Sequence, residues 1–137
     1  MGRLGELGRS FSLLAFVVLV GGVRGEEPKS EKVIPAVEAR DHIGEAVVVE
    51  MTVQTSKNAA PRREIYLDSE LDFHDEKNLA VVISYDHLNA FQQAGINDPA
   101  EHYRSKRIRV RGTLIREQEQ VRIRVEDPGR IVLVKEG

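Results

Sequence analysis

The sequence predicts a mostly β fold, a small closed sheet of five or six strands with a helical connection between the third and fourth strands. Apolar and polar residues alternate with period two in several segments, which is typical of half-buried strands. Helical signals gather in one stretch between two groups of strands. The chain has 137 residues, of which 41% are hydrophobic and 31% charged, so one ordinary domain is expected and a disordered or fibrous protein is not.

The N-terminal residues are predicted to be a targeting segment. Residues 11–23 form an apolar run that is shorter than the roughly 20 residues a membrane-spanning helix needs. We therefore expect a signal peptide over residues 1–25, cleaved after Gly25, and export to the periplasm or the cell exterior with no stable membrane span afterwards. An uncleaved N-terminal anchor is the alternative. Residues 26–32 are predicted to be a flexible leader and residues 33–137 the folded domain.

The first half of the domain carries three strand signals. A short helical segment over residues 36–43 precedes them and ends at Gly44. The first strand signal alternates cleanly, with Val47, Val49, Met51 and Val53 on one face. Residues 56–63 are polar and contain a proline, so they are predicted to be a loop. The three predicted strands span residues 45–55, 63–70 and 79–85.

The second half begins with helical signals and returns to strands. Asp86 is placed to cap a short helix that ends at Gly95, and Asp98 precedes a proline as in the first turn of a helix. Three strands follow, over residues 107–116, 121–125 and 131–134. Gly112 lies in the middle of the first of these strands, where the sheet of a barrel can bend sharply.

This order of elements is that of a small OB-type barrel, a Greek-key sheet of about five strands. Three segments resemble the exported bacterial family of OB-fold nucleic-acid-binding-like domains: EARDHIGEAVVVEMTV over residues 38–53, VVI over residues 81–83, and YRSKRIRVRG over residues 103–112. The resemblance covers the chain from Ile34 to its end. It implies the barrel and an oligonucleotide-type binding surface. The sequence departs from the family pattern at Met51 and Thr52, and in having few aromatic residues on its second and third strands.

No residue pattern predicts catalysis, a metal or a cofactor, and we expect a protein that is not an enzyme. The absence of cysteine excludes thiolate zinc sites and cysteine nucleophiles. The four histidines are dispersed and show no metal-ligand spacing. The acidic residues of the second strand and the turn after it are interpreted as a solvated edge, with a weak calcium site or a small hydrolase as alternatives; they are Asp68, Glu70, Asp72, Asp75 and Glu76.

Charges are segregated along the chain. Residues 104–124 carry eight basic and two acidic side chains, whereas residues 64–87 carry seven acidic and one basic side chain. Strand alternation places the basic residues of the later strands on one face, as a stripe of Arg107, Arg109, Arg111, Arg122 and Arg124. This stripe is suited either to phosphate contacts or to a solvated outer wall.

OB-type domains bind their ligands mainly on the second and third strands and on the loops beside them. On that basis the predicted ligand-binding residues are Lys57, Arg62, Arg63, Tyr66 and Arg116. The predicted function is an exported, non-enzymatic binding module for single-stranded nucleic acid. The alternative is an adaptor for an envelope protein or polymer, which the net charge of −4 over residues 26–137 and the few stacking aromatics favour. The sequence does not predict the oligomeric state.

Overall fold

The computed structural model describes residues 32–135. The predicted signal peptide, its cleavage point after Gly25 and all but the last residue of the predicted leader lie outside this range. Within it, no helix is both long and apolar enough to cross a membrane.

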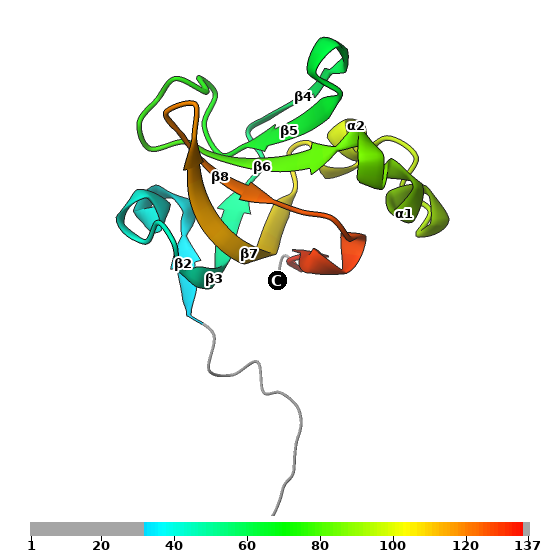
Figure 1. The fold of residues 1–137 in the computed structure, drawn as a ribbon. Coiled ribbons are helices and arrows are strands. Elements are labelled where there is room, and N and C mark those ends of the chain that lie inside the picture. The colour runs from blue at the N-terminus through cyan, green and yellow to red at the C-terminus, as the bar shows by residue number, and fades with distance from the viewer. Residues whose placement is uncertain (1–31, 136–137) are drawn as a thin grey trace, which may run out of the picture. The chain divides into compact units, whose positions relative to one another are not determined.

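The described residues form eight strands and several short helical elements (Figure 1). In chain order the strands are β2 (Val33–Pro35), β3 (Ala46–Thr52), β4 (Thr55–Ala59), β5 (Glu64–Asp68), β6 (Leu79–Ser84), β7 (Arg107–Glu117), β8 (Gln120–Arg124) and β9 (Ile131–Leu133). The helical elements are short: η5 (Ala36–Asp41), η6 (Ala60–Arg62), η7 (Tyr85–His87), α1 (Leu88–Gln93), α2 (Pro99–Tyr103) and η8 (Pro128–Arg130). The predicted mostly β class is confirmed.

The strands are hydrogen-bonded in the order β2-β3-β7-β8-β6-β5-β4, and β9 pairs with β7. Strands β4, β5 and β6 form an antiparallel meander, β6 lies parallel to β8, and β8 returns antiparallel to β7. This mixed order, with a helical connection between β6 and β7, is consistent with an OB-like fold, which is itself a partly open barrel.

Two details of the predicted barrel are wrong. Over the described residues the sheet has eight strands rather than five or six, and its hydrogen-bonded path is open rather than a closed ring. The two strands that were not predicted are β2, which pairs with β3, and β4, which pairs with β5. The predicted first strand is also divided, because Val53 donates its N–H to Lys106 on one side of the sheet while the next residue, Gln54, donates to Asp68 on the other. Only these two residues connect β3 to β4.

Strand β7 bends and thereby pairs with different neighbours along its length, as its curved ribbon shows (Figure 1). Residues 107–113 pair with β3, whereas residues 114–117 pair with β8. Gly112 lies next to this change of partner, and a Cβ at this position would be 2.9 Å from Cγ1 of Ile123. The close approach of β8 therefore requires glycine here, as the sequence predicted for the bend.

Residues 56–63 were predicted to be a loop, and this prediction is wrong for their first half. Strand β4 occupies Thr55–Ala59 and pairs with β5. Two of its polar residues bond to helical elements: Ser56 Oγ donates to the Ala100 carbonyl over 2.6 Å, and Asn58 accepts a hydrogen bond from the Tyr85 hydroxyl. The polar residues at these positions conceal the alternation that marks a strand.

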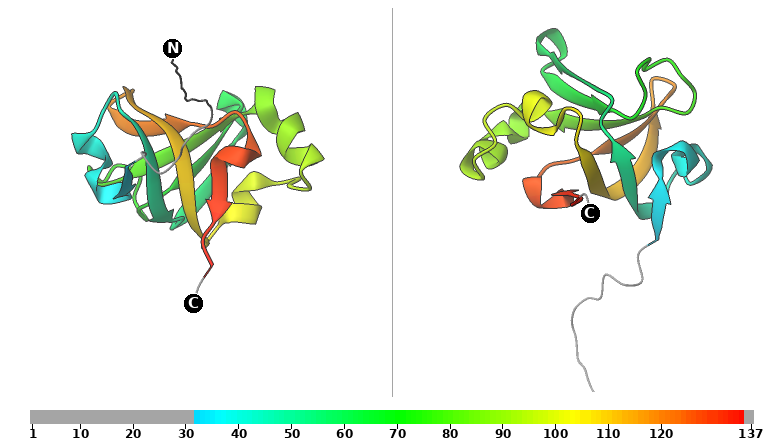
Figure 2. Two further views of the ribbon diagram at one scale, coloured as in Figure 1. Left: turned by 90° about the horizontal axis from the view of Figure 1, so that it is seen from below. Right: turned by 180° about the vertical axis from the view of Figure 1, so that it is seen from behind.

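The core lies between the strands and is closed at one end by the helical connection. Val47, Val49, Met51 and Val53 are all buried, as their alternation predicted. Two aromatic side chains from the connection, Phe91 and Tyr103, are the largest fully buried residues, and burial raises the pKa of the Tyr103 hydroxyl to about 12. Asp98 caps α2 by accepting a hydrogen bond from the Glu101 N–H. Further views show η5 and the α1–α2 connection on opposite sides of the strands (Figure 2).

Candidate nucleic-acid interface

A groove of about 700 Å³ lies over the outer face of strands β4, β5, β6 and β8. Residues that pair directly across neighbouring strands point to the same face of a sheet, and together they form a row across the strands. Two such rows lie on the outer face under the groove. One row is Lys57, Tyr66, Val82 and Arg124, and the neighbouring row is Thr55, Asp68, Ala80 and Arg122. Ala80 is the smallest residue of its row, so the floor of the groove is lowest between Asp68 and Arg122.

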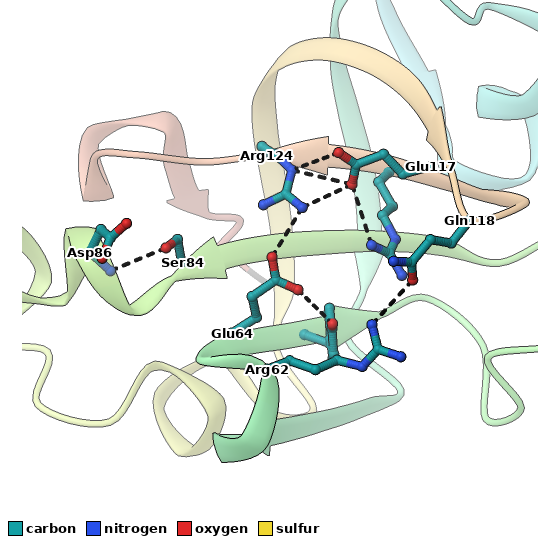
Figure 3. Close-up of polar contacts among 9 residues, drawn as sticks. Arg62, Glu64, Ser84, Asp86, Glu117, Gln118 and Arg124 are labelled. Carbon is teal, nitrogen blue, oxygen red and sulfur yellow. Dashed lines mark hydrogen bonds and ion pairs between the residues drawn. The ribbon is translucent and has the colours of Figure 1, made fainter.

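Three connections form the rim of the groove. The β4–β5 turn contributes Arg62, the β5–β6 loop contributes Phe73 and His74, and the β7–β8 turn contributes Gln118 and Glu119. Two of these connections touch, because Arg62 Nη1 donates a hydrogen bond to Gln118 Oε1 over 3.2 Å (Figure 3). The groove is therefore bridged at the end where the β4–β5 and β7–β8 turns meet.

The β5–β6 loop is held at its base by buried polar groups. Asn78 Nδ2 donates to Asp68 Oδ1, and Asn78 Oδ1 accepts from the backbone N–H of Glu70, both over 2.9 Å. Ser69 Oγ accepts from the backbone N–H of Leu79. Phe73 is half exposed near the middle of this loop, with its ring centre 3.9 Å from that of His74. The loop thus presents an accessible ring from an anchored base.

Tyr66 is fixed on the groove floor by its neighbours. Its hydroxyl donates to Glu64 Oε1 over 2.6 Å, and the guanidinium carbon of Arg122 lies 5.4 Å from its ring centre. Burial, followed by the hydrogen bond to Glu64, raises the pKa of the Tyr66 hydroxyl. The ring is therefore neutral and held in one orientation, which suits a stacking platform.

Two arginines and two glutamates form a compact network beside Tyr66, which we call the β8 network: Arg122, Arg124, Glu64 and Glu117. Figure 3 shows the contacts of Arg124 with Glu64 and Glu117. Arg124 Nη2 lies 2.9 Å from Glu117 Oε1 and 3.0 Å from Glu64 Oε2. Hydrogen bonds from Arg124 lower the pKa of Glu117. Burial acts to raise the pKa of Glu64, but hydrogen bonds from Tyr66 and Arg124 outweigh it, and the net shift is downward. The network thus pairs two guanidinium groups with two carboxylates, and their charges cancel.

The structure brings three of the five predicted ligand-binding residues together and places two elsewhere. Lys57, Arg62 and Tyr66 line the groove. Arg63 adopts a left-handed backbone conformation, and its guanidinium lies over the Tyr85 ring and 3.9 Å from Asp86. Arg116 is exposed on β7 and is not among the groove-lining residues.

The predicted basic stripe is divided between two parts of the sheet. Arg107 and Arg109 lie where β7 pairs with β3, and both bond the Glu50 carboxylate, with Arg109 Nε 2.8 Å from its Oε1. Hydrogen bonds from Arg109 lower the pKa of Glu50. Arg111 also pairs with β3, opposite Val48. Arg122 and Arg124 instead belong to the β8 network, where carboxylates neutralise them.

Some groove residues could not be recognised from the sequence. Asp68 was predicted to belong to a solvated acidic edge, and this prediction is wrong, because Asp68 is only 6% exposed. Asn78 and the floor of the groove enclose it. Phe73 and His74 were assigned to an acidic turn, and the phenylalanine in this charged segment is the one signal that could have indicated them. Among the described residues, no three His, Cys, Asp or Glu side chains lie close enough to hold a metal ion.

Comparison with known proteins gives similarity in fold alone. No family model matches the chain, and no curated protein matches it. A solved structure described as a "putative aspartyl-tRNA synthetase" from Leishmania major Friedlin has a TM-score of 0.50 and 13% identity, over 80% of this chain and 22% of that one. Asparaginyl-tRNA synthetase from Entamoeba histolytica, solved with asparaginyl-adenylate, has a TM-score of 0.47 and 13% identity. That match covers 77% of this chain and 24% of the synthetase. The chain thus spans less than a quarter of the length of either synthetase.

Proposed function

We propose that the groove binds single-stranded nucleic acid, and that the protein is a non-enzymatic binding module. One observation carries this proposal: two exposed cations, Lys57 and Arg62, and two accessible rings, Tyr66 and Phe73, line the same groove. A single strand is bound in this way in general, with its phosphates on basic side chains and its bases stacked on aromatic ones.

The position of the groove supports the proposal. It lies over the meander and between the strand-connecting turns, which is where OB-type domains bind oligonucleotides. The similarity in fold to part of a protein described as a tRNA synthetase is compatible with a nucleic-acid ligand. Lys57 makes no ion pair with another described residue, so its charge is available to a phosphate.

The cations that contact phosphate are few. Arg122 and Arg124 are neutralised by Glu64 and Glu117, so the β8 network positions Tyr66 and adds little attraction of its own. Lys57 and Arg62 therefore account for most of the salt dependence. Two cations neutralise about two phosphates, so we expect weak binding that falls as salt rises.

Export of the module by cleavage of residues 1–25 is a further part of the proposal, and it is supported by the apolar run over residues 11–23. The site of action would then be the periplasm or the cell exterior. N-terminal sequencing of the protein recovered from its host tests this part independently of ligand binding.

A second candidate function is an adaptor for an envelope protein or polymer. The observation that favours it is apolar exposure on the β5–β6 loop, where Leu71 is 75% exposed and Phe73 50% exposed beside the groove. Exposed apolar side chains on an anchored loop are suited to a protein partner. This candidate predicts capture of one specific envelope component, with no competition from added nucleic acid.

Fluorescence anisotropy of the full chain with a labelled oligo(dT) of about 15 nucleotides tests the leading proposal, at about 50 and 200 mM salt. We expect binding that weakens steeply between the two salt concentrations. Lys57→Ala and Arg62→Ala should each weaken binding and reduce the salt slope by about 0.7, the value for one phosphate contact on a single strand. Tyr66→Leu should weaken binding by about 1 to 3 kcal/mol without changing the slope.

Arg130→Ala is the matched control, because Arg130 is exposed on η8 and does not line the groove. Its affinity and slope should equal those of the unmodified protein. Loss of binding in Arg130→Ala equal to that in Arg62→Ala would remove the groove as the site. Absence of binding at the lower salt concentration would reject nucleic acid and leave the adaptor as the remaining candidate.

A further inference from the structure

A buried carboxylate lies on the floor of the groove and has no part in contacting phosphates or stacking bases. Asp68 is 6% exposed and lines the groove at the end of β5. Its Oδ1 accepts a hydrogen bond from Asn78 Nδ2, whereas Oδ2 accepts none from the described residues. An acidic side chain repels a polyanion, so its presence in a groove for nucleic acid calls for a different partner.

The surroundings of Asp68 keep one acceptor edge open toward the groove. Asn78 fixes the carboxylate from the side of the β5–β6 loop, and Ala80, directly opposite on β6, is too small to cover it. Tyr66 lies two residues earlier on the same strand and the same face, which separates the two Cα atoms by about 7 Å. A base stacked on the Tyr66 ring therefore has its edge within reach of Asp68.

A carboxylate discriminates among bases because it only accepts hydrogen bonds. Guanine presents two adjacent donors, N1–H and the N2 amino group, on its Watson–Crick edge. Adenine and cytosine place a ring nitrogen acceptor beside their amino group, and thymine and uracil flank a single N–H with two carbonyls. A carboxylate facing any of these meets an acceptor as well as a donor, which costs binding energy in a water-poor site.

We propose that Asp68 selects guanine at one position of the bound strand, where the base stacks on Tyr66 and donates N1–H and N2–H to the Asp68 carboxylate above Ala80. This inference rests on the proposed function and adds base selectivity to it. Asn78 is the positioning residue, because its amide holds the carboxylate with one edge toward the groove.

The test compares strands that differ at one base. Labelled oligo(dT) of about 15 nucleotides is prepared with a central guanine, adenine, cytosine or hypoxanthine, and binding to the full chain is measured by anisotropy. The guanine strand should bind at least about fivefold more tightly than the adenine and cytosine strands, as one well-placed pair of hydrogen bonds provides. Hypoxanthine lacks the N2 amino group and should lose most of this preference.

The Asp68→Asn variant should bind unmodified oligo(dT) at least as tightly as the unmodified protein, because a negative charge is removed from the groove. It should show no more than a twofold preference for guanine, because its amide N–H groups face the two N–H donors of guanine. Asp68→Glu keeps the charge but displaces the carboxylate, and should lose the preference as well. Asp41→Asn is the matched control, since Asp41 is exposed at the end of η5 and outside the groove lining, and it should retain the full preference. Thermal unfolding followed by circular dichroism confirms that each variant is folded.

The outcomes separate the two proposals. Failure of every strand to bind the unmodified protein overturns the proposed function and the selectivity with it. Normal binding of oligo(dT) without a guanine preference, or with a preference that Asp68→Asn leaves intact, overturns the selectivity alone. A preference that disappears in Asp68→Asn and persists in Asp41→Asn supports it.

Discussion

The guanidinium carbon of Arg122 on β8 lies 5.4 Å from the ring centre of Tyr66 on β5, with strand β6 between them. The contact joins two strands that share no backbone hydrogen bond. Arg122 is a buried cation. It is only 8% exposed, and its Nε has no hydrogen-bond partner among the described residues. Arg122 therefore serves as a structural support for the groove floor, and the groove-lining cations without a carboxylate partner among the described residues are Lys57 on β4 and Arg62 in the β4–β5 turn.

Truncation of Arg122 should destabilise the fold, and an apolar side chain of similar length should not. Arg122→Ala removes the buried side chain whose guanidinium lies over the Tyr66 ring, and with it one cation of the β8 network, with an expected loss of about 2 kcal/mol in the free energy of unfolding. Arg122→Met keeps the stem and removes the unpaired buried Nε, so its loss should stay below about 1 kcal/mol. Urea denaturation measures both. Equal losses in the two variants would show that the charge, not the packing, stabilises the floor.

The β7–β8 turn is strained by its sequence. Gln118 and Glu119 both have positive φ, 50° and 63°, in a two-residue hairpin turn that favours asparagine and glycine. Glu119→Gly should therefore raise the free energy of unfolding by about 1 kcal/mol, since glycine adopts this conformation without strain. Glu126→Gly, at an exposed residue after β8 without positive φ, is the control and should not stabilise. A urea midpoint that falls in Glu119→Gly would contradict the assigned turn.

The bend of β7 depends on the missing side chain of Gly112. In Gly112→Ala the new Cβ would lie 2.9 Å from Cγ1 and 3.2 Å from Cδ1 of the fully buried Ile123. The core around Ile123 does not move freely, so we expect a loss of about 1 to 3 kcal/mol in the free energy of unfolding. Thr113→Ala, at the exposed neighbouring residue, should change stability by less than about 0.5 kcal/mol in the same urea titration.

Acid should weaken the β8 network through Glu117. Hydrogen bonds from Arg124 lower the pKa of Glu117 below its ordinary value of 4.5, so the unfolded chain takes up the proton first. Its contribution to stability is thus complete above pH 4.5 and is lost as the pH falls through the folded-state pKa. Glu117→Gln should be less stable than the unmodified protein at neutral pH and should lose less stability on acidification. Urea midpoints at neutral and acid pH measure both effects.

Glu126→Gln is the control for this prediction, because Glu126 forms no ion pair with the described residues. It should follow the unmodified protein at both pH values. If Glu117→Gln loses as much stability in acid as the unmodified protein does, Glu117 is not linked to folding in the way that its contacts with Arg124 require.

The sequence predicted those features that local patterns encode. Alternation placed Val47, Val49 and Val53 in the core and turned Tyr66 outward, and Gly112 marked the bend. These predictions succeeded because each depends on one strand and its own two faces. The mostly β class and the helical connection before β7 followed from the same patterns.

The remaining features depend on contacts between distant segments. Strand β4 was assigned to a loop because Ser56 bonds to the Ala100 carbonyl and not to an apolar core. The basic stripe looked continuous because nothing in the sequence connects Glu50 with Arg109, or Glu64 with Arg124. The predicted signal peptide lies outside the described residues and stays a prediction. The OB-like fold is supported, but no family model matches the chain, so the predicted exported family stays a prediction as well.

The central claim is that the groove, and not the basic part of β7 and β3, receives the nucleic acid. Amide chemical-shift mapping by heteronuclear NMR, with unlabelled oligo(dT) added to the isotope-labelled chain, tests it most directly. The account predicts that the largest shifts occur at Lys57, Tyr66, Phe73 and Gln118, and that Arg107 and Arg109 show little change. Shifts concentrated at Arg107 and Arg109, or no shifts at low salt, would contradict it.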